Sequence, residues 1–153
     1  MFHAARYDRG RLEFKRFRAD HFKALVLQDS QAFFQPVVDD PAYARGLEGA
    51  GPAWSCFEGD LCIGCGGIVE QWRGRGVAWA LFSPLATGAK FLTIHRATKD
   101  ALELSTFHRI EAYVQEDFPQ GHQWAKMLGF EAESVMKKFT AEGKDSTMYV
   151  RVR

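Results

Sequence analysis

The sequence lacks the features that tie a chain to a membrane, a metal or a polyanion. It has no apolar run of the roughly 18 residues that a membrane-spanning helix needs. Its three cysteines, Cys56, Cys62 and Cys65, are odd in number, and no second Cys or His group completes a zinc site. Lys and Arg number 20 and Asp and Glu 19, so the net charge of +1 gives no general attraction to polyanions. We therefore expect buried free cysteines and no metal, nucleic-acid or membrane partner.

The N-terminal residues and the length of the chain favour one cytoplasmic domain. The first residues, MFHAARYDRGRLEF, carry charges within the first ten positions and do not read as a signal peptide. A chain of 153 residues fits a single domain, here 1–153, that buries roughly two thirds of the surface exposed by its unfolded form. No repeat, linker or low-complexity stretch interrupts it.

The stretch around which the chain is organised runs from Val77 to Arg96. An apolar run over 77–82 predicts a strand buried on both faces, and Ser83 and Pro84 end it. A small-residue loop containing Gly88 leads into an amphipathic helix with Ile94, Ala97, Ala101 and Leu104 on one face. Such a turn can hold a phosphate, because backbone amides point outward at the positive end of the helix dipole. The alternative is an ordinary strand-to-helix connection.

The other elements follow from caps, turns and periodicity. We expect strands over 11–17, 53–58, 61–71, 109–114, 133–139 and 146–152, and helices over 19–27, after Asp40 and after Asp117. Gly59 and Asp60 form a hairpin turn, and residues 72–76 form a second turn. Three glycines, Gly64, Gly66 and Gly67, indicate a bulge or a close approach of another backbone. Asp117 is expected to cap the last helix with Gln120 as its capping-box partner, and Gly129 to end it.

The order is strand, two helices, three antiparallel strands, helix, strand, helix, two strands. The strands over 77–82 and 109–114 are joined by a right-handed helical crossover and are therefore parallel. With ALFSPLATGAK, HRIEAYV and HQWAKMLGFE, the chain resembles the GCN5-related N-acetyltransferase (GNAT) superfamily over nearly its whole length. EQWRGRGVAWALFS with GHQWAKMLGFE resembles more narrowly the small GNAT-like proteins of tailed phages, some of them internal virion proteins. The resemblance implies an α/β (α+β) fold with a mixed central sheet of about seven strands.

The resemblance also implies a co-substrate, acetyl-CoA, held between the two parallel strands with its pyrophosphate on the turn after the first. The residues that would bind it are Leu81, Phe82, Ser83, Thr87, Gly88, Ala89, Lys90, Phe91 and Lys126. Two features depart from the superfamily. Leu85 and Lys90 stand at the first and last places of the phosphate loop, and Ala125 stands where many members have a general-acid Tyr.

Acetyl transfer to an amine needs a deprotonated amine and a way to protonate the leaving thiolate. A CoA thiol is acidic enough to leave without a strong acid, so the missing Tyr does not exclude catalysis. The candidate bases are Glu70 and Glu111, acting directly or through water. As alternatives, Glu70 is a solvated charge at a strand end and Glu111 pairs with Arg109 or Lys126 inside the fold.

We expect the isolated histidines and the tryptophans to have structural rather than catalytic roles. His95 and His122 lie on helices beside apolar stripes, where a histidine is more often packed or capping than catalytic. Trp72, Trp79 and Trp124 are expected in the core, because large aromatic side chains mostly supply buried area.

We thus expect an N-acetyltransferase that moves an acetyl group from acetyl-CoA to a primary amine of a protein or small molecule, as a monomer or homodimer. Two alternatives remain open at this point: a non-catalytic GNAT-like virion or assembly protein of a phage, and a module that binds CoA without transferring the acetyl group.

Overall fold

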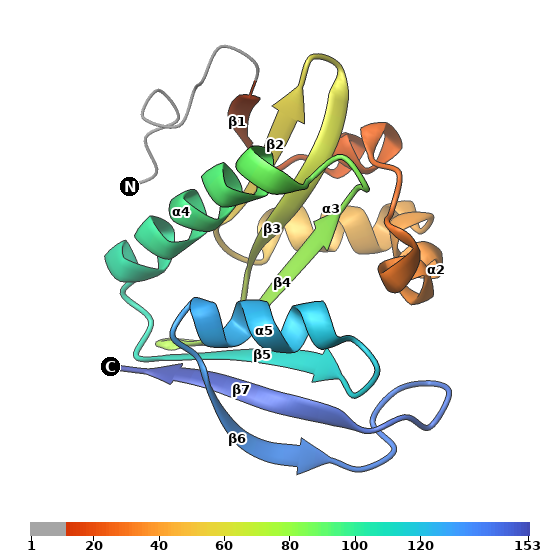
Figure 1. The fold of residues 1–153 in the computed structure, drawn as a ribbon. Coiled ribbons are helices and arrows are strands. Elements are labelled where there is room, and N and C mark those ends of the chain that lie inside the picture. The colour runs from red at the N-terminus through yellow and green to blue at the C-terminus, as the bar shows by residue number, and fades with distance from the viewer. Residues whose placement is uncertain (1–11) are drawn as a thin grey trace. The chain divides into compact units, whose positions relative to one another are not determined.

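The computed structural model describes residues 12–153 (Figure 1). The predictions that fall on residues 1–11, the start of the first strand at Arg11 and most of the segment tested for a signal peptide, lie outside this range. Within it no helix is long and apolar enough to cross a membrane. The strands are β1 (Leu12–Arg16), β2 (Ala53–Glu58), β3 (Leu61–Trp72), β4 (Arg75–Phe82), β5 (Arg109–Gln115), β6 (Glu131–Met136) and β7 (Ser146–Val152). The helices are η1 (Ala19–Ala24) and η2 (Asp29–Phe34), both 3₁₀, and α2 (Gln35–Val38), α3 (Pro41–Gly49), α4 (Gly88–Leu104) and α5 (Pro119–Met127).

The seven strands hydrogen-bond in the order β1-β2-β3-β4-β5-β7-β6, so the fold is the predicted mixed α+β sheet. β1 lies at an edge, and β5 lies inside the sheet between β4 and β7. Two compact units divide the chain: Met1–Val69 with Trp79–Ser105, and Glu70–Ala78 with Thr106–Arg153. The single-domain organisation stays a prediction.

The first unit has an aromatic and aliphatic core beneath η1 and α3. Phe17 is 2 % exposed, and its ring lies 5.2 Å from the ring of Trp79 and 5.2 Å from that of Phe22. Asp40 caps α3 by accepting a hydrogen bond from the Ala42 amide at 2.9 Å, as predicted from the Asp-Pro pair. Burial of such large side chains supplies most of the driving force for folding.

The glycine-rich strand β3 shows both features that its composition indicated. The register with β2 shifts between Cys56 and Phe57, which leaves a bulge at Ile63. A side chain at Gly67 would meet the Pro52 carbonyl oxygen at 2.5 Å, so β2 approaches too closely for any residue larger than glycine. The three cysteines are free and buried, as expected.

The second unit contains the antiparallel strands β5, β7 and β6, the start of β4 paired parallel to β5, and helix α5 packed against β5. β5 pairs with β7 along its whole length, from Arg109 opposite Val152 to Gln115 opposite Ser146. Helix α5 ends as predicted: Gly129 has a φ of +92°, and the Phe130 amide returns to the Ala125 carbonyl oxygen at 3.0 Å. A positive φ of this size favours glycine over any residue with a side chain.

Two helical predictions in the first unit are wrong. The helix expected over 19–27 is a 3₁₀ helix that ends at Ala24, because Leu25 and Leu27 are buried on one side of an extended segment whose Val26 is 70 % exposed. Neither η2 nor α2 was expected. On α4 the buried leucine is Leu102, whereas Leu104, the last helical residue, is 59 % exposed.

Three predictions in the second unit are also wrong. Asp117 does not cap α5: the N-cap is Phe118, and the Asp117 carboxylate instead binds the Lys144 ammonium at 2.6 Å.

Strand β6 stops at Met136 rather than Phe139, because Lys138 adopts a φ of +50° and its amide donates to Asp145 in a turn. Trp72 is 63 % exposed and is no part of a core.

Candidate functional site

The turn between β4 and α4 is held by local hydrogen bonds. Ser83, 4 % exposed, accepts the Leu85 amide on its hydroxyl at 3.1 Å and the Ala86 amide on its carbonyl oxygen at 3.1 Å. Phe82 packs its ring against Phe91 at the start of α4, with ring centroids 5.8 Å apart. The side chains of Leu81, Phe82 and Ser83 are therefore buried, and only the part of the turn that follows them is open to a ligand.

The first turn of α4 offers free backbone donors. Thr87, Gly88 and Ala89 are exposed. The amides of Gly88 and Ala89 donate to no acceptor within residues 12–153. Gly88 has a φ of +57°, and a side chain there would meet nothing within 4 Å, so open space lies beside these amides. Free amides at the N-terminus of a 17-residue helix attract an anion through direct hydrogen bonds and the helix dipole. These residues fit the phosphate site that the sequence predicted.

Lys90 is already paired. Its ammonium lies 2.8 Å from one carboxylate oxygen of Glu58 and 2.9 Å from the other, and both side chains are partly buried. Glu58 ends β2 and has no local sequence signal that connects it with Lys90, 32 positions away. The positive charge that was expected beside the phosphate loop is thus largely compensated by a carboxylate.

Sequence reasoning missed Gln31, which fixes the end of β4. This buried side chain, 3 % exposed, donates from Nε2 to the Ala80 carbonyl oxygen at 2.9 Å and accepts the Phe82 amide on Oε1 at 2.8 Å. The Gln28 amide completes the arrangement by donating to the Phe82 carbonyl oxygen at 2.9 Å. The edge of β4 just before the turn to α4 is therefore hydrogen-bonded by an amide side chain in place of a neighbouring strand.

The parallel ladder between β4 and β5 is short. It consists of three pairs, Arg75 with Arg109, Gly76 with Ile110 and Val77 with Glu111. The parallel pairing confirms the helical crossover predicted between these strands. Glu111, one of the two candidate bases, therefore stands at the last pair of this ladder.

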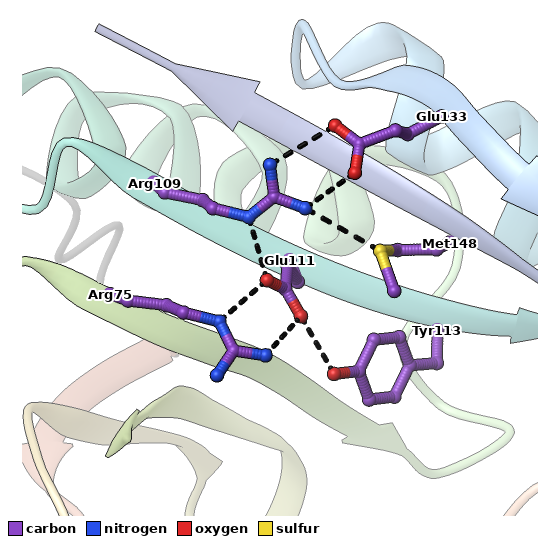
Figure 2. A network of polar contacts seen from close by, with 6 residues as sticks. All are labelled: Arg75, Arg109, Glu111, Tyr113, Glu133 and Met148. Carbon is purple, nitrogen blue, oxygen red and sulfur yellow. Dashed lines mark hydrogen bonds and ion pairs between the residues drawn. The ribbon is translucent and has the colours of Figure 1, made fainter. Parts of the chain in front are cut away.

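Figure 2 shows that Glu111 is the centre of an ion network on β5. Arg75 binds it in a bidentate manner, with Nε and Nη2 at 2.7 and 2.9 Å from its two oxygens. Arg109 Nε donates to the same carboxylate at 2.7 Å and turns its other nitrogens to Glu133, at 2.6 and 3.0 Å. The hydroxyl of Tyr113 donates to Glu111 at 2.8 Å.

These contacts keep Glu111 ionised. The hydrogen bond from Arg75, with those from Arg109 and Tyr113, lowers the pKa of this carboxyl to about 2. Burial, which leaves the side chain 2 % exposed, raises the pKa and so opposes this shift. A carboxylate of such low basicity, with both oxygens occupied, is poorly suited to accept a proton from an amine. The pair with Arg109 that the sequence offered as the alternative is present. The other offered partner, Lys126, is an exposed residue of α5 and not among the groups that bind Glu111.

Glu70, the other candidate base, is exposed and lines a hollow of about 540 Å³ in the second unit. The other lining residues are Arg73, Gly74, Thr106, Phe107 and His108. The candidate site residues thus fall into two groups. Those from Leu81 to Phe91 belong to the first unit, and Glu70, Glu111 and Lys126 belong to the second.

Helix α5 carries no general acid at position 125, where many GNAT members have a tyrosine. Ala125 is buried, and the nearby His122 is fully engaged, with Nδ1 2.7 Å from the Tyr149 hydroxyl and Nε2 2.8 Å from the Gln115 carbonyl oxygen. His122 is thus the packed residue that its position predicted. Burial raises the pKa of Tyr149, so this phenol stays protonated.

Several solved structures with a similar fold are acetyltransferases. An N-acetyltransferase from Staphylococcus aureus matches with a TM-score of 0.70 at 8 % identity over 92 % of this chain and 97 % of the other. RimL, a ribosomal alpha-N-protein acetyltransferase in complex with coenzyme A, matches with 0.69 at 16 % identity over 93 % and 94 %. A chimera of the spermidine N-acetyltransferase SpeG from Vibrio cholerae matches with 0.68 at 16 % identity over 93 % and 95 %.

No protein-family model and no curated protein sequence matches the chain. At identities of 8 to 16 % the likeness to the three structures concerns the fold. The sheet order, the parallel β4 and β5 and the turn before α4 agree with it. The chain therefore has the fold of the GNAT acetyltransferases.

Proposed function

We propose that the protein is an N-acetyltransferase that transfers an acetyl group from acetyl-CoA to a primary amine. The observation that carries this proposal is the first turn of α4, where the exposed amides of Gly88 and Ala89 follow β4 on a GNAT fold. Proteins with this fold include a protein α-amine acetyltransferase and a spermidine acetyltransferase, so both protein and small-molecule amines are candidate acceptors.

The residues of the turn fit the diphosphate of the co-substrate. The amides of Gly88 and Ala89 would donate to phosphate oxygens, and the exposed hydroxyl of Thr87 lies at the same helix end. Acetyl-CoA supplies a thioester, whose C–S bond breaks as the amine nitrogen bonds to the carbonyl carbon. The thiolate that leaves finally takes the proton that the amine gives up.

Glu70 is the preferred base. Its carboxylate is exposed and lines the hollow described above, where an amine can reach it. Glu111 is set aside, because Arg75, Arg109 and Tyr113 occupy its oxygens and its pKa is about 2. We assign Glu111 the role of holding the start of β4 against β5.

A second function is favoured by specific residues. The compensation of Lys90 by Glu58 suits a protein that binds CoA weakly, and the alanine at position 125 suits a protein without catalysis. The narrower sequence resemblance to phage-encoded GNAT-like proteins points the same way, toward a virion or assembly component. We place the transferase in a cytoplasm, and in the host cytoplasm or the virion if a phage encodes the chain.

The test is release of CoA thiol from acetyl-CoA in the presence of an amine panel that includes spermidine, free amino acids and peptides with free N-termini. Glu70→Gln should lower turnover by a factor on the order of 100 to 10,000 while CoA binding persists. Glu131→Gln, an exposed glutamate on β6, is the matched control and should leave turnover unchanged. CoA binding without thiol release for any amine would support the non-catalytic function instead.

A further inference from the structure

The hollow beside Glu70 is built from two short segments of the second unit. Residues 70, 73 and 74 come from the end of β3 and the turn to β4, and residues 106–108 come from the loop between α4 and β5. Its volume of about 540 Å³ falls within the range of small-molecule sites in proteins. Phe107 gives it an apolar group, and Thr106 gives it a hydroxyl.

The two segments are tied to each other by their backbones. The amides of His108 and Arg109 both donate to the Gly74 carbonyl oxygen, at 3.0 and 3.1 Å. Gly74 has a φ of +88°, and a Cβ there would collide with the imidazole ring of His108. The turn therefore requires glycine both for its conformation and for the place of His108.

Trp72 and Arg75, the residues that flank Arg73 and Gly74, are also fixed by contacts. The guanidinium of Arg75 is bound by Glu111 and lies 4.3 Å from the centre of the Trp72 ring. Because both flanks of the turn are fixed in this way, the hollow exists before a ligand enters. A preformed site loses less conformational entropy on binding than a flexible one.

The hollow carries two charges of opposite sign, on Glu70 and Arg73. Within residues 12–153, neither Glu70 nor Arg73 takes part in an ion pair. The neighbouring network adds no net charge, because two arginines, Arg75 and Arg109, face two glutamates, Glu111 and Glu133. A ligand in the hollow thus meets one carboxylate and one guanidinium of its own.

We propose that this hollow binds a small molecule that carries both an ammonium and a carboxylate group, in the simplest case an α-amino acid with an apolar side chain. The ammonium binds Glu70, the carboxylate binds Arg73 with His108 beside it, and the apolar part contacts Phe107. A ligand with only one charge leaves the other protein charge without a partner, so the pair of charges selects a zwitterion.

The inference deepens the proposed function and rests on it in one respect, that Glu70 is the base for the acceptor amine. An ammonium held on Glu70 loses its proton there and becomes the nucleophile. The acceptor is then an amine that also bears a carboxylate, rather than a polyamine such as spermidine. Binding of the zwitterion itself requires no acetyl-CoA.

The test measures binding of leucine, leucinamide and 4-methylpentanoate to the whole protein without acetyl-CoA, by calorimetry or ligand-observed NMR. The three ligands share the same carbon chain, and the last two lack the carboxylate and the amine respectively. We expect leucine to bind about tenfold more tightly than either analogue, as two charge-assisted contacts predict.

Two variants assign the contacts. Arg73→Gln should abolish the preference for leucine over leucinamide, and Glu70→Gln the preference over 4-methylpentanoate. Arg45→Gln and Glu131→Gln, both exposed and far in sequence from the hollow, serve as controls that keep both preferences.

Two results would overturn the inference: no binding of leucine at millimolar concentration, or binding that neither variant alters. A failure of acetyl transfer with intact leucine binding would overturn the proposed function and leave the site standing.

Discussion

The side-chain oxygen of Gln31 accepts a hydrogen bond from the backbone amide of Phe82 at 2.8 Å, across 51 positions of sequence. Through this contact, and the donation of its nitrogen to the Ala80 carbonyl oxygen, one glutamine closes the edge of β4 just before the turn to α4. The position of that turn therefore depends on a residue from η2, which lies outside every motif that the sequence offered.

The first prediction concerns this glutamine. Gln31→Leu keeps a side chain of similar size but leaves the Phe82 amide and the Ala80 carbonyl oxygen without their side-chain partner. The free energy of unfolding should fall by roughly 2 to 6 kcal/mol, since two buried groups are left unpaired and each costs about 1 to 3 kcal/mol. Urea denaturation measures this, and a loss below about 0.5 kcal/mol would show that water or another group replaces the amide. Gln35→Leu, on the exposed contact with Asp39, is the control and should change little.

The second prediction is a loss of stability in acid. The folded-state pKa of Glu111, about 2, lies below the ordinary value of 4.5, so its ion pairs stabilise the protein above pH 4.5 and the contribution falls as pH drops toward 2. For a shift of this size the contribution is about 3 kcal/mol, and it applies to a side chain that is 2 % exposed.

The stability–pH profile of Glu111→Gln measures that contribution. The variant should lose stability at pH 7 and show a flatter profile between pH 5 and pH 2 than the parent protein. Glu133→Gln removes a carboxylate that is 44 % exposed and should change the profile far less. Identical profiles for the parent and Glu111→Gln would contradict the network as drawn.

A third prediction follows from the pair of Lys90 with Glu58. If a phosphate binds at the start of α4, Glu58→Gln removes a negative charge near it and should raise CoA affinity about threefold. One unit charge at roughly 7 Å in water is worth about 0.6 kcal/mol. Lys90→Ala should lower the affinity, by about 1 kcal/mol, and both effects should shrink as salt rises. Titrations at low and high salt test this, and salt-independent changes would speak against a phosphate at this place.

Much of the fold follows from local sequence. β2 and β7 were predicted at their observed bounds, because Gly59 and the turn over 141–145 separate alternating or apolar runs cleanly. Gly129 was identified because the left-handed residue that ends a helix is usually glycine. The 3₁₀ helices were missed because their periodicity differs from that of an α-helix and their ends are set by tertiary burial, as with Leu25 and Leu27.

The site was less predictable, because its determining contacts join distant positions. Arg109 was offered, beside Lys126, as an alternative partner of Glu111, because buried charges are usually paired. Arg75 was not, because β4 was taken to start at Val77 and the arginine was assigned to a turn. Gln31 is a single polar residue in a polar segment, and no spacing rule connects it with a strand edge 49 and 51 positions away.

A fourth prediction is that CoA stabilises the folded protein. At a concentration of about 100 times the dissociation constant, binding adds roughly 2.7 kcal/mol to the free energy of unfolding. At this chain length the melting temperature should rise on the order of 5 to 10 °C. Differential scanning fluorimetry with CoA and with adenosine separates binding of the diphosphate from that of the nucleoside. No shift at millimolar CoA would exclude both the transferase and the CoA-binding module.

The last prediction is that Gly88 is required for CoA binding and not for folding. Its φ of +57° is unfavourable for a β-branched residue, and the space that its missing side chain leaves open lies beside the free amides. Gly88→Val should abolish CoA binding through the strained backbone and through methyl groups at the place of the phosphate oxygens. Because nothing in residues 12–153 lies within 4 Å of that place, the variant should still fold, with a loss of roughly 1 to 3 kcal/mol from backbone strain. Gly46→Val, in the interior of α3 and likewise without neighbours within 4 Å, is the matched control and should keep full CoA affinity. A folded Gly88→Val that binds CoA as tightly as the parent protein would place the co-substrate elsewhere, because the amides of Gly88 and Ala89 would then have no part in holding it.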